Sequence, residues 1–96
     1  MNVDETLVQR GKTYGDFAHH AGVASNIKRA MQDSPNWGQM PDVHHQALAV
    51  IADKIARVLT GDPRYADNAH DLGGYAQLVE NYINSGGVSC LPPSHG

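Results

Sequence analysis

Cysteine is almost absent from this chain of 96 residues, in which Cys90 stands alone. A single cysteine excludes an intramolecular disulfide and any zinc motif built on paired cysteines. It fits a reducing compartment, and we expect a cytoplasmic protein. Long apolar runs are also missing, because no stretch approaches the roughly 18 residues that a membrane helix needs. The first residues, MNVDETLVQRGK, are polar and acidic, unlike a secretory signal.

Basic charge is scarce as well. The chain has 7 Lys and Arg residues against 10 Asp and Glu residues, and its formal net charge is -3 with the histidines neutral. A free-standing DNA-binding domain normally presents a basic face, so we do not expect nucleic acid to be the main partner. Hydrophobic residues make up 41% and charged residues 18%, which is ordinary for a globular protein. The length then indicates one domain with one modest core.

A helical period dominates the chain, because alternating apolar and polar residues never persist for more than a few positions. We predict a short first helix and three longer ones, running from about Asp4 to Gly11, from Asp16 to Asp33, from Pro41 to just before Gly61, and from after GDPRYAD to about Ser85. The predicted fold is all-α, a compact bundle of three main helices plus the short N-terminal one, over residues 1–86. Residues 87–96 contain glycines and prolines and are expected to form a flexible tail.

The third helix carries the clearest apolar stripe and is the expected centre of the core. Its stripe consists of Val43, Ala47, Leu48, Ile51, Ile55, Val58 and Leu59. Amphipathic helices this few in number tend to leave one face unburied, so we expect a homo-oligomer, most simply a symmetric dimer.

Two aspartates four residues apart, Asp67 and Asp71, form a candidate metal site. They project from one helix face and would repel each other unless a hard cation such as Mg²⁺ lay between them. Asp53 on the third helix is a further candidate ligand. The alternative is that both aspartates favour the helix start through the helix dipole, an explanation that is stronger for Asp67 than for Asp71. The histidines give no zinc site, because neighbours in a helix point about 100° apart.

Lys54 and Arg57 are candidate phosphate ligands. They lie beside the apolar stripe of the third helix, where two cations can reach into a groove between helices. The alternative is an ordinary ion pair between Asp53 and Arg57, with Lys54 reaching water.

Two glycine-containing stretches, KTYGD and the pair Gly73-Gly74, are the other unusual features. In KTYGD, Gly15 permits a turn and Asp16 can cap the second helix, while a functional interpretation has Tyr14 stacking on a base and Lys12 meeting phosphate. Gly73 and Gly74 weaken a helix interior, so we expect another helix, or a ligand, to come close there.

The strings ETLVQRGKTYGDFAHHA and ALAVIADKIARVLTGDPRYADNAHDLGGYAQLV, with Trp37 between them, resemble a family of small phage and prophage domains of unknown function. The resemblance covers Glu5 to Val79. Its most specific parts are Lys54 to Arg57, Gly61-Asp62 and Asp71 to Ala76. That family is similar to nucleotide-modification-associated phage domains and, more distantly, to MazG-like all-α nucleotide pyrophosphohydrolases.

The MazG-like resemblance implies a helical, oligomeric domain in which carboxylates hold Mg²⁺ around a triphosphate. Its Glu-x-x-Asp pair falls on Asn68 and Asp71 here, and its earlier Glu-Glu-x-x-Glu motif has no counterpart. Few acids and several cations favour binding over hydrolysis, because metal-assisted cleavage needs carboxylates to hold the ions.

Three hypotheses about function follow. The first is a phage-encoded domain that binds or sequesters a nucleotide or nucleotide-derived signal, with a counter-defence role. In this hypothesis Lys12, Lys54 and Arg57 bind the phosphate groups. The base stacks on Tyr14, Tyr75 or Trp37. The second is a Mg²⁺-dependent MazG-like pyrophosphohydrolase using Asp53, Asp67 and Asp71. The third is a helical adaptor or inhibitor of a host protein.

Overall fold

A computed structural model of the chain describes residues 2–92. Those residues form four α-helices and one short 3₁₀ helix, with no strand among them: α1 (Val3–Tyr14), α2 (Phe17–Gln32), η1 (Trp37–Gln39), α3 (Asp42–Thr60) and α4 (Ala66–Asn84). The all-α prediction, with three long helices and a shorter N-terminal one, is confirmed.

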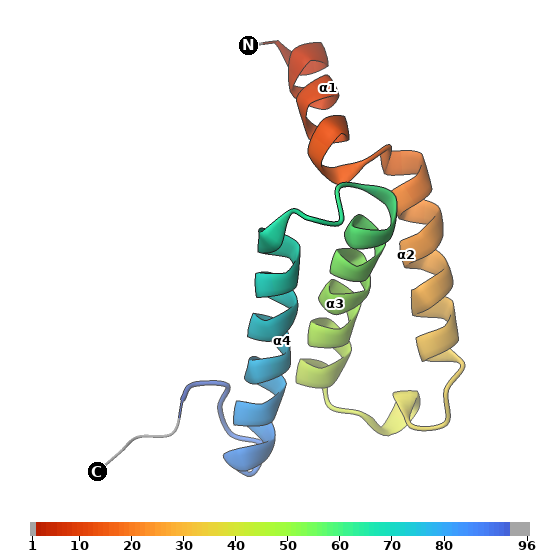
Figure 1. The fold of residues 1–96 in the computed structure, drawn as a ribbon. Helices are drawn as coiled ribbons and strands as arrows, with labels where there is room; N and C mark the ends of the chain where they lie inside the picture. The colour runs from red at the N-terminus through yellow and green to blue at the C-terminus, as the bar shows by residue number, and fades with distance from the viewer. Residues whose placement is uncertain (1, 93–96) are drawn as a thin grey trace.

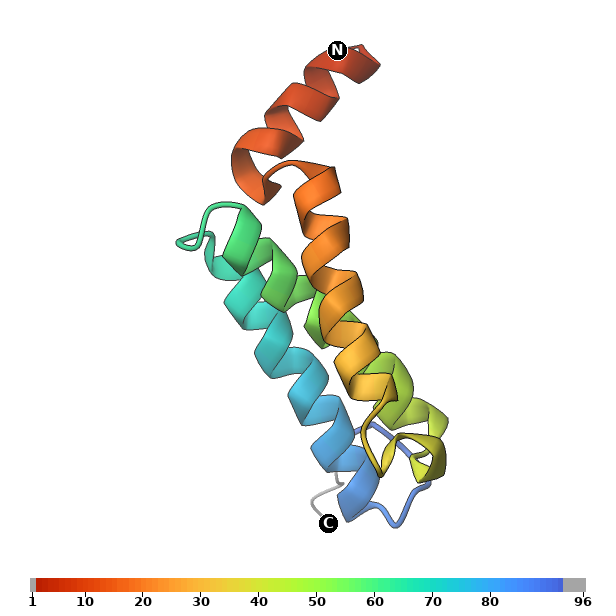
Figure 2. The same ribbon diagram turned by 90° about the vertical axis from the view of Figure 1, so that its right-hand side faces the viewer.

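The three long helices lie in a row with α3 in the middle (Figure 1). Helix α3 packs against α4 on one side and against α2 on the other, and it runs antiparallel to both (Figure 1). The smallest dimension of the molecule is 23 Å, about two helix diameters. Helix α1 extends from the end of this row, beyond the last turn of α3 (Figure 2).

The contact surfaces of α3 are made of small side chains. The apolar residues that are fully buried within residues 2–92 are all alanines: Ala24, Ala47, Ala52 and Ala56. Alanine lets neighbouring helix axes approach closely, because interaxial distance depends on the side chains at the contact. The larger residues of the predicted stripe are half-buried, and Leu59 is 65% exposed, so its predicted place in the core is wrong. Leu59 lies in the last turn of α3.

The beginning and end of α1 differ from the prediction. Asn2 caps the helix in place of Asp4, since its side-chain oxygen accepts the Glu5 N–H at 2.8 Å. Gly11 does not end the helix, which continues to Tyr14 and stops at Gly15, whose φ of 81° is outside the helical region. The predicted cap of the second helix is confirmed, because the Asp16 carboxylate accepts the Ala18 N–H at 3.1 Å.

Two chain segments cross in close backbone contact at the end of α3. A Cβ at Gly15 would overlap the carbonyl oxygen of Thr60, and a Cβ at Gly61 would lie 2.5 Å from the carbonyl carbon of Tyr14. The Asp62 N–H donates to the carbonyl oxygen of Thr13 at 3.0 Å. We call this crossing the elbow, meaning residues 13–16 together with residues 60–62. It fixes the position of α1 relative to α3.

Gly73 and Gly74 are exposed on α4. A Cβ built at either position meets no atom of the described chain within 4 Å. No helix among the described residues makes the expected close approach at these glycines, and the close backbone contact within the chain occurs at the elbow instead.

Replacing Gly74 by alanine should therefore stabilise the protein. The new methyl group has free space, and alanine is better than glycine in a helix interior by about 0.5–1 kcal/mol. Urea unfolding followed by far-UV circular dichroism measures the change in free energy. A loss of stability in Gly74→Ala would mean that this surface is covered by something other than the described chain.

The residues after α4 fold back on its last turns. Asn81, which is buried, donates from Nδ2 to the carbonyl oxygen of Cys90 at 3.0 Å. The Ser85 hydroxyl oxygen accepts the N–H groups of Val88 and Ser89. Residues 93–96 of the predicted flexible tail lie outside the described residues. Over residues 2–92, no helix combines the length and the apolar character needed to cross a membrane.

Candidate functional site

A hollow lies at the elbow, between α1, the start of α2 and the end of α3. It has a volume of about 490 Å³. We call it the elbow pocket, and it is lined by Leu7, Arg10, Gly11, Tyr14, Gly15, Asp16, Phe17, His20 and Arg57. Helices α1, α2 and α3 thus contribute to one cavity, which exists because the two glycines allow the backbones to cross.

Arg57 is the central cation of this pocket. Its guanidinium carbon lies 4.9 Å from the centre of the Tyr14 ring, within the range of a cation–π contact. Among the described residues, no carboxylate lies within ion-pair distance of Arg57. The alternative pairing with Asp53 does not form, because Asp53 accepts the Lys28 ammonium of α2 at 2.9 Å. The guanidinium therefore keeps its charge-assisted hydrogen bonds available for an anion.

A second hollow of about 370 Å³ adjoins the elbow pocket along the α2–α3 contact. Phe17, His20 and Arg57 line both hollows, and Ser25, Lys28 and Asp53 belong to the second alone. Arg57 thus lies where the two hollows meet, and a bound anion there would be accessible from both.

The aromatic residues of the elbow differ in how much of each ring is free. The Tyr14 ring has Arg57 on its face and the edge of Tyr65 at 5.7 Å between ring centres. Phe17 is 78% exposed, and its ring is stacked on His20 at 5.9 Å with an interplanar angle of 28°. Phe17 therefore has more free surface for stacking than Tyr14.

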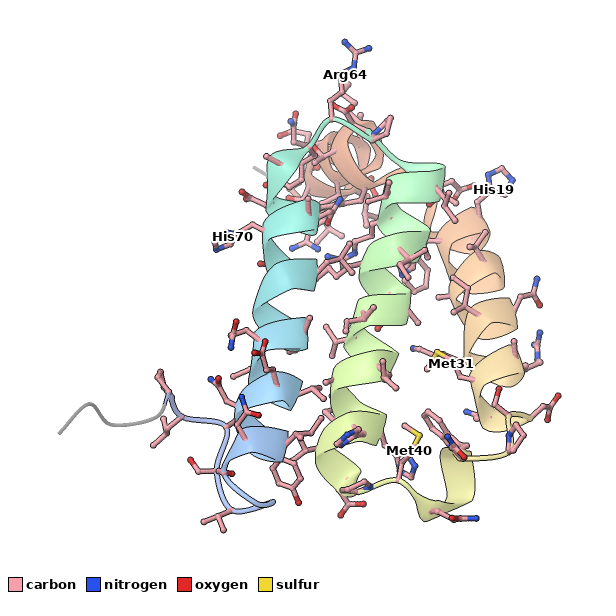
Figure 3. All side chains as sticks on the ribbon, turned by 60° about the horizontal axis from the view of Figure 1, so that its bottom comes forward. His19, Met31, Met40, Arg64 and His70 are labelled. Carbon is pink, nitrogen blue, oxygen red and sulfur yellow. The ribbon has the colours of Figure 1, made fainter. Side chains whose placement is uncertain are left out.

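The surroundings of His20 favour the neutral form of its imidazole ring. Burial lowers its pKa from the ordinary value of 6.5, and the positive charges of Arg57 and Lys28 act in the same direction, against the opposing effect of Asp53. Its Nδ1 is buried and has no hydrogen-bond partner within the described chain. The neighbouring His19 projects outward from α2 (Figure 3). Only one member of this histidine pair therefore faces the pocket.

Lys54, the other candidate phosphate ligand on α3, forms an ion pair with a carboxylate. Its ammonium lies 2.9 Å from Asp71 of α4, and this interaction lowers the pKa of Asp71 below its ordinary value of 3.8. The ion pair joins α3 to α4, which gives Lys54 and Asp71 a structural role between the two helices.

Acidification should weaken the protein through this ion pair. Because the pKa of Asp71 is lower in the folded state than in the unfolded state, its stabilising effect is present above about pH 4 and is lost as the pH falls through the folded-state value. We expect Asp71→Asn to lose less stability than the original protein between neutral and acidic pH. Thermal unfolding across this pH range measures it, and Lys54→Met is the control that should flatten the profile in the same way.

The other predicted site residues lie apart from the pocket. Lys12 is exposed on α1 and Tyr75 lies on α4; neither lines a hollow described above. Trp37 lies before α3, at the end opposite Arg57, and its ring is stacked on His45 at 4.2 Å.

The three candidate metal ligands are not brought together. Asp53 contacts Lys28 of α2, and Asp71 contacts Lys54 of α3. Asp67 interacts with the Tyr65 hydroxyl, and this interaction, with a smaller one from Tyr14, raises the pKa of Tyr65 to about 12. Within residues 2–92, no group of three or more His, Cys, Asp or Glu residues is arranged to hold a metal ion. Asn68, onto which the predicted MazG-like resemblance carries a glutamate, is only 1% exposed.

Sequence reasoning missed Arg10, Phe17 and His20 as pocket residues. Arg10 and Tyr14 are four residues apart and share a face of α1, but that spacing has meaning only if the helix continues through Gly11. Phe17 is an apolar residue on a helix, which by itself indicates a place in the core. The signal that it is different is its place directly after the Gly15-Asp16 turn, in the first position of α2.

Comparisons with protein-family models, with curated proteins and with solved structures found no match for this chain. The resemblance to phage and MazG-like domains therefore stays a prediction.

Proposed function

We propose that this protein binds a nucleotide or nucleotide-derived signal in the elbow pocket. The observation that supports the proposal most directly is Arg57, which lines both hollows and has no acidic partner among the described residues. Phosphate suits such a site, because a guanidinium forms two parallel charge-assisted hydrogen bonds to its oxygens. Arg10, which lines the same pocket, adds a second cation.

The remaining lining suits the base and sugar of a nucleotide. The exposed ring of Phe17 offers a surface on which any base can stack, and such contacts contribute about 1–3 kcal/mol per base. The neutral ring of His20 offers hydrogen bonds. The pocket volume of about 490 Å³ is within the range of roughly 300–1,000 Å³ typical of small-molecule sites.

Binding is better supported than hydrolysis. Hydrolysis assisted by Mg²⁺ needs carboxylates free to hold the ion, whereas Asp53 and Asp71 each contact a lysine. We propose accordingly that the protein sequesters its ligand. If it is a phage protein acting in the host cytoplasm, a signalling nucleotide of host defence is the natural target. We also propose that it acts as a homo-oligomer, since large apolar residues are exposed on α1, α2 and α4.

A thermal-shift screen tests this proposal. The panel should contain nucleoside mono-, di- and triphosphates, cyclic nucleotides and ADP-ribose species, each with and without Mg²⁺. A ligand at 100 times its dissociation constant adds about 2.7 kcal/mol of stability, which such a screen detects.

Two results would count against the proposal. Absence of a shift with every compound, supported by absence of heat in isothermal titration, would overturn it. Mg²⁺-dependent pyrophosphate release that is lost in Asp71→Ala would show the MazG-like hydrolase instead.

A further inference from the structure

Helix α1 has an apolar face that the described residues of its own chain leave open. None of its described residues is buried, and Val3, Leu7 and Val8 are 74%, 62% and 62% exposed. The helix is 12 residues long and extends away from the other helices (Figure 2). An isolated helix of that length is marginal in water, so α1 needs a packing partner along its free part.

The apolar side of α1 is covered by other residues at its Tyr14 end and is exposed along the rest of the helix. Val3, Leu7 and Tyr14 lie on one side of the helix, since they are four and seven residues apart. The Tyr14 end of this stripe packs on Arg57 and Tyr65. Leu7 borders the elbow pocket together with exposed Phe17, which extends the apolar area toward α2. A partner would therefore lie along Val3 and Leu7, beside the pocket.

Charge identifies the occupant as a second copy of the same helix. The first turn of α1 carries Asp4 and Glu5, whereas its second half carries Arg10 and Lys12. When two such helices pack antiparallel, the acidic start of each helix lies opposite the basic second half of the other. Their macrodipoles then point in opposite directions, which is also favourable. If Leu7 faces the partner's Leu7, Asp4 is level with the partner's Arg10, because each lies three residues from the centre. A parallel pair would instead place like charges side by side.

We propose that two copies of this chain form a dimer through antiparallel packing of their α1 helices about a twofold axis. Such an interface is self-complementary, as a twofold dimer requires. It also places the partner's helix beside Leu7 and Arg10, so that each elbow pocket is bordered by both chains. The dimer does not rest on the proposed nucleotide binding, and its test uses no ligand.

Molecular mass from light scattering tests the proposal through charge reversal. The original protein should show twice the chain mass of 10.3 kDa. One variant, Asp4→Lys with Glu5→Lys, makes α1 wholly basic. The other, Arg10→Glu with Lys12→Glu, makes its charged residues wholly acidic. Each variant alone should have the mass of one chain, because like charges then face each other. An equimolar mixture should recover the mass of two chains.

Two further variants keep the test specific. Leu7→Glu should be monomeric and should not recover on mixing with the others. Ile83→Glu, which alters an equally exposed apolar residue on α4, should keep the mass of the original protein. Far-UV circular dichroism confirms that each variant is folded. A monomeric original protein, a dimer that survives both charge reversals, or a dimer lost in Ile83→Glu would overturn the proposal.

Discussion

Gly15→Ala should lower the free energy of unfolding by about 2–6 kcal/mol. Two effects add: a non-glycine residue in this region of φ and ψ costs about 1–3 kcal/mol, and displacing the overlapping carbonyl of Thr60 costs about as much again. Small domains have stabilities near the lower end of about 5–15 kcal/mol. We therefore expect this one methyl group to leave α1 undocked or the chain largely unfolded at ambient temperature.

Chemical denaturation followed by circular dichroism measures this loss. Gly61→Ala should act in the same direction, since its Cβ would approach the backbone of Tyr14 and Thr13, although its φ of -111° is ordinary. The two changes affect one crossing, so their effects should not add in the double variant.

Gly22→Ala is the matched control for the elbow glycines. Gly22 lies inside α2, and a Cβ there meets no atom of the described residues within 4 Å. We expect Gly22→Ala to gain about 0.5–1 kcal/mol. Equal unfolding midpoints for Gly15→Ala and Gly22→Ala would contradict the close crossing seen in the structure.

The helices themselves were predictable because their signals are local. The apolar period and the residues Pro41 and Gly61 bracket α3, and its observed bounds, Asp42–Thr60, lie just inside them. Gly11 shows the limit of local signals. It resembles a helix end, but the chain continues as a helix until Gly15, where contact with Thr60 requires the residue with no side chain.

The candidate site was only partly predictable because it depends on contacts across the sequence. Arg57 and Tyr14 were each selected for their chemistry, yet nothing in the sequence shows that the end of α3 would bring them together. The same applies to Lys54, which was predicted beside Arg57 but contacts Asp71 of the next helix. Spacing along one helix gives the face of a residue, whereas its partner depends on which helix packs there.

Arg57→Ala should weaken binding of the best nucleotide in the panel by about 30- to 4,000-fold. Removing one partner of a desolvated charge pair costs about 2–5 kcal/mol or more, and each 1.4 kcal/mol is a factor of ten. Arg57→Lys should recover only part of the affinity, because lysine keeps the charge but loses the planar fork and its contact with Tyr14. Isothermal titration at a temperature where all variants are folded measures these differences.

Arg64→Ala is the matched control for loss of a single arginine. Arg64 is exposed in the loop between α3 and α4 and projects away from the helices (Figure 3). It changes the net charge by the same amount as Arg57→Ala and should leave the affinity within twofold when the salt concentration is held constant, since exposed charges are largely screened. Equal loss in both variants would show that the nucleotide responds to overall charge and not to the elbow pocket. Loss confined to Arg57→Ala, with the molecular mass in solution unchanged, would place the phosphate where the two hollows meet.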